Sequence, residues 1–376
     1  MTALKLRQLT VHHVRLPLVS PFTTSFGTET VKSTYLIEAL LDTGSATVTG
    51  WGECVAMDEP LYSSEFLTAA AEVTRRWLAP ALFGVDELTA ETVAHHLNAF
   101  VGHPMAKAAL EMAVLDVQLR AENRSFADYL GVTRDHVPSG VSVGIQDSPE
   151  TLVRVVGGYL DEGYARIKLK IMPGADLDHV GAIRREFGDE LRLQVDANAA
   201  YTLADATHLR RLDEFDLLLI EQPLGESDLR QHAELARQVT TPICLDESIV
   251  SAESAADAIS LGATSVINVK PGRVGGYLEA RRIHDLARAH GVAVWCGGML
   301  ETGVGRAANA ALAGLPGFTL PGDVSGSNRF YAHDITEEII MRDGAVAVPT
   351  GPGFGVTVDL DRLAEVTTAT EHLAHP

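Results

Sequence analysis

The chain has 376 residues, which is enough for two domains or for one large barrel with an added module. Hydrophobic residues make up 46% of it and charged residues 21%, a balance that is typical of compact globular proteins and excludes disordered, collagen-like and coiled-coil proteins. Fifty acidic against 30 basic residues leave a net charge of -20, which would repel nucleic acids and anionic membranes. We therefore expect neither as a partner.

The sequence shows no feature of an exported or membrane protein. Its first residues lack the apolar stretch of a signal peptide, and no window holds 18 uncharged apolar residues. Cys54, Cys244 and Cys296 lack CxxC spacing, so we expect three buried, reduced thiols. These features predict a cytoplasmic location.

Residues 1–130 read as a separate α+β module. Alternating apolar and polar residues predict strands near Leu6–Leu16 and Thr34–Leu41, and a helix is expected over Ala106–Glu122. We interpret this part as a capping domain.

Residues 131–325 show a repeating pattern of a short aliphatic run, a turn and an amphipathic helix. Eight such runs predict a (β/α)8 TIM-type barrel. The predicted strands are 141–143, 167–170, 191–196, 217–221, 243–246, 266–270, 292–296 and 318–320, and the predicted helices include 149–160, 203–212, 252–261 and 277–290.

Residues 326–376 are expected to return to the first module. Ala345–Pro349 and Gly355–Val358 read as short strands that pack on it. The capping domain would then be built from both ends of the chain.

Five predicted barrel strands end in a charged residue. Lys170, Asp196, Glu221, Asp246 and Lys270 follow one another at intervals of 26, 25, 25 and 24 residues. Because one βα unit returns the chain to the same rim, all five side chains should meet at the C-terminal face, where barrel active sites lie.

The three carboxylates in this series are candidate metal ligands. Asp196, Glu221 and Asp246 offer oxygen donors without a matching Cys or His, which favours Mg²⁺ or Mn²⁺ over Zn²⁺. Asn198 and Glu247 lie next to these ligands in the chain. They either orient the ligands and lysines or cap the helices that follow, and the sequence leaves both readings open.

Lysines flank the carboxylates on both sides. Lys168 and Lys170 share one face of a strand, because side chains two residues apart point the same way. Lys270 lies four strands further round and should face Lys170 across the mouth. A carbon atom held between them would lose a proton to one lysine and gain one from the other.

The chain resembles the enolase superfamily, in its muconate-lactonizing-enzyme-like subgroup, through this Lys-x-Lys on strand two and the lysine on strand six. Within that subgroup, the segments 270–276 (KPGRVGG) and 297–303 (GGMLETG) are most similar to the N-succinylamino acid racemase/o-succinylbenzoate synthase family. The resemblance implies two catalytic lysines, a third lysine that supports the substrate carboxylate, and ligands for Mg²⁺, for which Mn²⁺ or Co²⁺ can substitute. These residues are Lys170 and Lys270, then Lys168, and then Asp196, Glu221 and Asp246.

The resemblance also implies contacts with the substrate. Phe22 and Phe26 belong to a cap loop that closes over the site, and Met57 belongs to a second cap loop. Ser142 matches a substrate-contacting serine, although an ordinary hydroxyl of the barrel interior is an equal alternative. Arg273 matches an arginine of racemising members and is expected to lower the pKa of Lys270, with a plain surface arginine as the alternative. Further expected contacts are Asn198, Gly298, Met299 and Leu300.

The favoured function is racemisation of an N-acylamino acid, a small carboxylate substrate, by a homo-oligomeric enzyme. The alternative is o-succinylbenzoate synthase, or both activities in one enzyme. Dipeptide epimerase is disfavoured because Gly322–Ser325 lacks an Asp-x-Asp pair. Cycloisomerase is also less favoured, and so is a barrel that has lost catalysis, because all five rim residues are intact.

Overall fold

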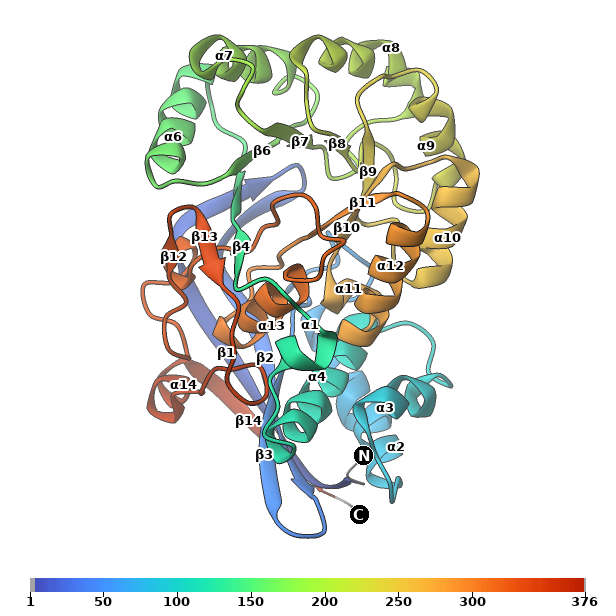
Figure 1. Ribbon diagram of the computed structural model, residues 1–376, viewed down its shortest axis with the longest axis vertical. Helices are drawn as coiled ribbons and strands as arrows, with labels where there is room; N and C mark the ends of the chain where they lie inside the picture. Colours follow the sequence, from blue (N-terminus) through green and yellow to red (C-terminus); the bar gives the residue numbers. More distant parts are fainter. Residues whose placement is uncertain (1–3, 375–376) are drawn as a thin grey trace.

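The computed structural model describes residues 4–374, so Met1–Ala3 at the start of the N-terminal segment lie outside the described residues. Two bodies are stacked along the long axis of the molecule (Figure 1). A barrel of parallel strands with surrounding helices forms one, and a twisted antiparallel sheet with its own helices forms the other. The first and last strands of the described chain both belong to the second body.

The antiparallel sheet has the strand order β14-β1-β2-β3. Its strands are β1 (Lys5–Thr24), β2 (Gly27–Asp42), β3 (Thr47–Cys54) and β14 (Thr367–Ala374). Leu9 and Val11 of β1 are buried, as the alternation in the sequence predicts. The register shifts between His13 and Val14, and Val14 is buried as well. The hairpin of β1 and β2 extends beyond the sheet as far as the barrel (Figure 1), and Thr24 pairs with Gly27 at its tip.

Helix α4 (Pro104–Ala121) packs across this sheet. Its backbone lies so close to β3 that a Cβ at Gly52 would come within 2.0 Å of the Ala109 carbonyl. Among residues 4–374, no helix is long and apolar enough to cross a membrane. Further helices of this body are α1 (Leu67–Val73), α2 (Ala79–Phe83), α3 (Ala90–Leu97) and α5 (Phe126–Leu130), and a π-helical turn, Thr74–Leu78, joins α1 to α2.

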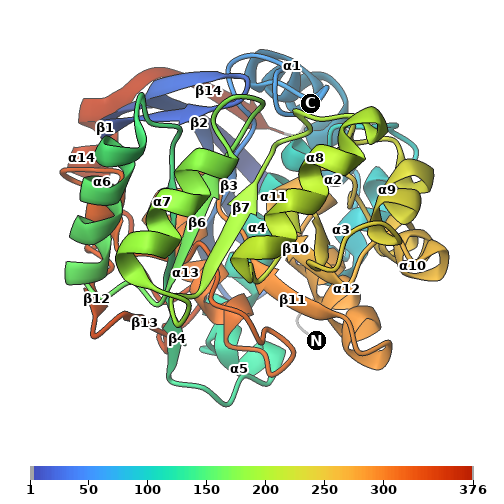
Figure 2. The ribbon, with the colours of Figure 1, turned by 90° about the horizontal axis from the view of Figure 1, so that it is seen from above.

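Seven parallel strands form the curled sheet of the barrel, in the order β5 to β11. They are β5 (Gly140–Val143), β6 (Arg166–Lys170), β7 (Leu193–Asp196), β8 (Ile220–Glu221), β9 (Ile243–Leu245), β10 (Val266–Val269) and β11 (Ala293–Cys296). Figure 2 shows α6 to α10 on the outside of these strands. The helices are α6 (Pro149–Asp161), α7 (Leu177–Phe187), α8 (Ala206–Leu209), α9 (Leu229–Ala236), α10 (Ala252–Leu261), α11 (Pro271–Val274), α12 (Tyr277–Ala289) and α13 (Gly303–Ala313).

The prediction of an eighth strand at 318–320 is wrong, because this segment does not form a regular strand. Phe318 bridges to Val294 of β11, and Gly322 bridges to Ser139 next to β5, so the segment joins the two edges of the sheet by isolated contacts. Pro321 lies between these contacts and has no N–H to donate, which prevents a continuous ladder.

The prediction for the C-terminal strands also needs correction. β13 (Ala345–Ala347) pairs with β4 (His136–Pro138) and β12 (Met341–Arg342), not with the antiparallel sheet, and 355–358 forms no regular strand. After α14 (Leu360–Val366), β14 pairs with β1 instead. Most side chains of β14 are exposed, so its sequence alternates only weakly between apolar and polar residues. The sequence pattern therefore does not predict this strand.

Two buried carboxylates join the two bodies at helix N-termini. Glu53 of β3 accepts hydrogen bonds from the amides of Thr302 (2.9 Å) and Gly305 (3.0 Å) at the start of α13. Glu111 of α4 accepts one from the amide of Leu278 (3.1 Å) in the first turn of α12. Free amides at a helix N-terminus favour a negative charge. Burial opposes it, and raises the pKa of Glu53 to about 7 and that of Glu111 to about 8.

The close approach of β3 to α4 predicts a large effect of Gly52→Ala. The added methyl group would overlap the Ala109 carbonyl, so the free energy of unfolding should fall by about 3 kcal/mol or more. Gly84→Ala is the control, because a Cβ at Gly84 would lie 3.8 Å from its nearest neighbour. Urea unfolding of both variants tests this, and an equal midpoint for the two would contradict the packing.

The raised pKa of Glu111 predicts that the stability of the protein depends on pH. Its folded pKa of about 8 exceeds its value in the unfolded chain, so the native state binds more protons between about pH 4.5 and 8. Stability from this group is therefore lost as the pH rises through that window. Glu111→Gln should gain stability relative to the wild type from pH 5 to 8, measured by urea unfolding. Glu122→Gln at the exposed end of α4 is the control, and parallel pH curves for wild type and Glu111→Gln would refute the expectation.

Candidate active site

The five predicted rim residues lie at the same end of the barrel. Lys170 of β6 is the register partner of Asp196 of β7, which is in turn the partner of Glu221 of β8. Asp246 and Lys270 follow the last residues of β9 and β10 directly. The parallel register therefore explains why a repeat of about 25 residues brings these side chains together.

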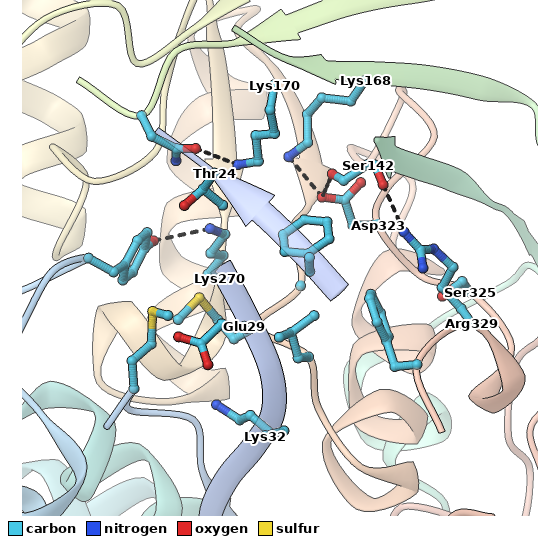
Figure 3. A pocket seen from close by; sticks show the side chains of 18 of the residues that line it. Thr24, Glu29, Lys32, Ser142, Lys168, Lys170, Lys270, Asp323, Ser325 and Arg329 are labelled. Carbon is cyan, nitrogen blue, oxygen red and sulfur yellow. Dashed lines mark hydrogen bonds and ion pairs between the residues drawn. The ribbon is translucent and has the colours of Figure 1, made fainter. Parts of the chain in front are cut away.

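A pocket lies between this end of the barrel and the cap. Lys168 and Lys170 extend into it from β6, and Lys270 extends into it from just after β10 (Figure 3). Eight of the residues expected to contact substrate line it, namely Phe22, Phe26, Met57, Ser142, Asn198, Gly298, Met299 and Leu300. Glu247 and Arg273 do not line this pocket.

Lys168 is surrounded by carboxylates. Its Nζ lies 2.8 Å from Asp323, 3.1 Å from Glu221 and 3.4 Å from Asp196. The ammonium group also lies over the ring of Trp295. Burial acts to lower the pKa of Lys168, but the three carboxylates outweigh it and raise the pKa above its ordinary value. Lys168 therefore carries a permanent charge, which suits a group that binds a carboxylate.

Lys170 is held by Asp196 and Asn198. Its Nζ donates to Oδ2 of Asp196 and to Oδ1 of Asn198, each at 2.6 Å. Nδ2 of Asn198 donates to Oε1 of Glu247 (2.9 Å). Neither Asn198 nor Glu247 caps a helix, since Asp205 precedes α8 and Ser251 caps α10. Of the two readings left open by the sequence, the structure favours the one in which both residues orient a lysine.

Lys270 is held from the barrel and from the cap. Its Nζ lies 2.7 Å from Oδ2 of Asp246 and 3.1 Å from the hydroxyl of Tyr62, a residue of the second cap loop. The Tyr62 hydroxyl also donates to Oδ1 of Asp246 (3.1 Å). Burial acts to lower the pKa of Lys270, but Tyr62, Glu247 and Glu221 outweigh it and the pKa is raised.

Arg273 lies behind Lys270 and is only 2% exposed. It forms an ion pair with Asp246, and it donates to the Tyr62 hydroxyl (3.3 Å) and the Ile249 carbonyl (2.8 Å). The expected contact with substrate is wrong, because other residues form the pocket wall. In this arrangement the neighbouring negative charges dominate and the pKa of Lys270 is raised, so the lowering expected from Arg273 stays a prediction.

Asp323 is a site residue that the sequence reasoning missed. Its carboxylate accepts from Ser142 Oγ (3.2 Å) and from Arg166 (2.9 Å), in addition to Lys168. Burial would raise the pKa of Asp323, but Lys168 and Arg166 hold it well below its usual range. The sequence signal that could have identified Asp323 as a site residue is its position at the end of the eighth barrel segment. A single aspartate there does not match an Asp-x-Asp pair. Tyr62 was also missed, and it lies in an irregular loop without a periodic pattern.

The proposed metal ligands have suitable chemistry. Asp196, Glu221 and Asp246 supply only oxygen donors, as Mg²⁺ prefers. Beside them, Oε2 of Glu247 is buried and has no hydrogen-bond partner in the described part of the chain. Within residues 4–374, no three His, Cys, Asp or Glu side chains are grouped closely enough to hold a metal ion. In this arrangement each of the three carboxylates instead lies against a lysine.

The three cysteines do not line the pocket. Cys54, Cys244 and Cys296 are buried and free, which confirms the expectation from their spacing. Burial raises the pKa of the Cys54 thiol to about 12, so it is not a nucleophile at neutral pH.

Buried lysines and carboxylates at the mouth of a capped barrel define an enzyme active site of the enolase-superfamily type. The profile of the mandelate racemase/muconate lactonizing enzyme N-terminal domain matches residues 6–131, and the enolase C-terminal domain-like profile matches residues 151–362. The chain belongs to this mandelate racemase/muconate lactonizing enzyme family of the enolase superfamily.

Individual relatives align over almost the whole chain. An N-succinylamino acid racemase from Amycolatopsis sp is 61% identical, over 97% of this chain and 98% of the relative. An o-succinylbenzoate synthase from Geobacillus kaustophilus is 44% identical, over 97% and 96%. The crystal structure of an enolase-superfamily member from Listeria innocua superimposes with a TM-score of 0.94 at 41% identity, covering 99% of both chains.

Proposed function

We propose that the protein is a Mg²⁺-dependent racemase of N-acylamino acids, with N-succinylamino acids as the substrate class. One observation carries the proposal. Lys170 at the end of β6 and Lys270 just after β10 line the same pocket, and three strands separate β6 from β10 in the barrel wall. The racemase that is 61% identical over nearly the whole chain supports the choice of reaction.

In this mechanism the two lysines act on opposite faces of the α-carbon. One lysine accepts the α-proton and the other returns a proton to the opposite face, which inverts the configuration. Lys168 keeps its charge and binds the substrate carboxylate. Asn198 orients Lys170, and Tyr62 orients Lys270. The cap loops exclude water from the pocket.

Asp196, Glu221 and Asp246 would hold the metal ion. Bound Mg²⁺ would supply positive charge next to the substrate carboxylate and so lower the cost of the negative charge that develops as the α-proton leaves. The carboxylates of these three residues also pair with the three lysines of the pocket. The same groups would therefore set both the metal affinity and the positions of the lysines.

The metal assignment predicts that a chelator abolishes turnover and that added Mg²⁺ restores it. Asp196→Asn should raise the Mg²⁺ concentration for half-maximal rate by more than about tenfold, because it removes a charged ligand. Glu226→Gln, on an exposed carboxylate after β8, is the matched control and should leave the Mg²⁺ titration unchanged. Full activity in excess chelator would contradict the assignment.

o-Succinylbenzoate synthase is the second candidate. The relative that is 44% identical over nearly the whole chain carries this name, and a syn dehydration would use the same residues. Lys170 would be the base, and Lys270 would stabilise the intermediate as a cation. Conversion of the cyclohexadiene precursor to o-succinylbenzoate, without exchange of any amino acid proton, would favour the synthase over the racemase.

The two-base mechanism predicts opposite behaviour of two variants. In deuterium oxide, Lys170→Ala and Lys270→Ala should each exchange the α-proton of one enantiomer only, because one base remains on one face. Racemisation should fall by about 10²-fold or more in both, the usual contribution of a general acid or base. Proton NMR of each enantiomer measures this. If either variant exchanges both enantiomers equally, the assignment is wrong.

A further inference from the structure

The tip of the β1–β2 hairpin is fastened to the barrel at two points. The Thr23 carbonyl accepts a hydrogen bond from the amide of Ile145 (3.2 Å), in the loop after β5. The Ser25 hydroxyl donates to the carbonyl of Asn198 (3.3 Å), in the loop after β7. Since β6 lies between β5 and β7, the tip crosses the end of the strand that carries Lys170.

Asn198 connects the hairpin to the catalytic groups. Its amide donates to Oδ1 of Asp196 (3.0 Å), and its side chain contacts both Lys170 (2.6 Å) and Glu247 (2.9 Å). Its carbonyl is the acceptor for Ser25. A shift of this one residue would therefore move the group that orients Lys170.

The conformation of Asn198 depends on its contacts. Asn198 has φ +41° and Ala199 has φ +61°, a left-handed backbone conformation that residues other than glycine rarely adopt. The amide of Ala199 donates to the Gln222 carbonyl (2.8 Å), and Asn198 is only 9% exposed. A segment in this conformation persists only where several contacts hold it. Loss of one contact is therefore expected to change the backbone conformation of Asn198.

Lys270 has a different contact with the cap. Its partner there is the Tyr62 hydroxyl of the second cap loop, at 3.1 Å, whereas the Ser25 hydroxyl is directed at Asn198. Lys170 is thus linked to the β1–β2 hairpin through Asn198, whereas Lys270 contacts the second cap loop directly. Loss of the Ser25 hydroxyl should therefore change the position of Lys170 and leave that of Lys270 unchanged.

We propose that Ser25 is a positioning residue for Lys170, acting through the carbonyl of Asn198. The inference rests on the proposed racemase function. When the hairpin lies over the pocket, the hydroxyl of Ser25 holds Asn198 in the conformation that places its side chain on Lys170. The closed cap then serves one of the two bases in addition to excluding water.

The experiment measures α-proton exchange of each enantiomer of an N-succinylamino acid in deuterium oxide at saturating substrate. Lys170→Ala and Lys270→Ala first identify which enantiomer each lysine deprotonates. Ser25→Ala should then slow the Lys170-dependent exchange about fivefold, the factor expected for one ordinary hydrogen bond. The Lys270-dependent exchange should change by less than about twofold, because that lysine keeps its own cap contact. Ser25→Thr keeps a hydroxyl and should restore the wild-type ratio of the two rates.

Thr28→Ala is the matched control. It removes a hydroxyl that pairs with Thr23 within the same hairpin (2.9 Å), so it should change both exchange rates by the same factor. Equal slowing of both enantiomers in Ser25→Ala would overturn the proposal, because Ser25 would then act on cap closure alone. Unchanged rates would overturn it as well. A wild-type protein that exchanges neither enantiomer would instead refute the proposed racemase function.

Discussion

Charges buried at the barrel mouth must be neutralised by neighbours, and much of the surrounding structure meets this requirement. An ion removed from water costs several kcal/mol unless an opposite charge lies beside it. Lys170 and Lys270 each lie within 2.7 Å of a carboxylate, Asp196 or Asp246. Lys168, at 2% exposure, has three carboxylates within 3.4 Å. The lysines can therefore be buried in the pocket, where their charges act more strongly on a bound substrate than they would in water.

The cap is fixed to the barrel by the same kind of interaction. Glu53 and Glu111 project from the cap onto the N-termini of α13 and α12, whose amides partly offset the cost of burying a carboxylate. The base of the cap is therefore held by buried polar contacts, whereas the hairpin tip has only a few hydrogen bonds to the barrel. This distribution suits a cap whose body stays in place while its loops admit substrate.

The sequence predicted those features that follow from a regular repeat. Because a βα unit has a nearly constant length, Lys170 and Asp196 could be placed on one rim without a structure. The eighth barrel segment was overpredicted, since Pro321 breaks a ladder that hydrophobicity alone suggests. Asp323 and Tyr62 were missed because their roles arise from contacts across the fold. For Asn198 the sequence allowed two roles, and only the three-dimensional position of Lys170 distinguishes them.

The two candidate reactions share their first step and differ in the second lysine. Under the proposed function, both begin when a base removes a proton next to a carboxylate, so the contacts of Lys170 with Asn198 serve either reaction. Racemisation also requires Lys270 to exchange a proton, whereas dehydration requires only its positive charge. Tyr62 and Arg273 lie beside Lys270 and its carboxylate partner, whereas Asn198 contacts Lys170. On this proposal, the balance between the two activities depends on the groups around Lys270, while the proton transfers that use Lys170 depend on the groups around Lys170.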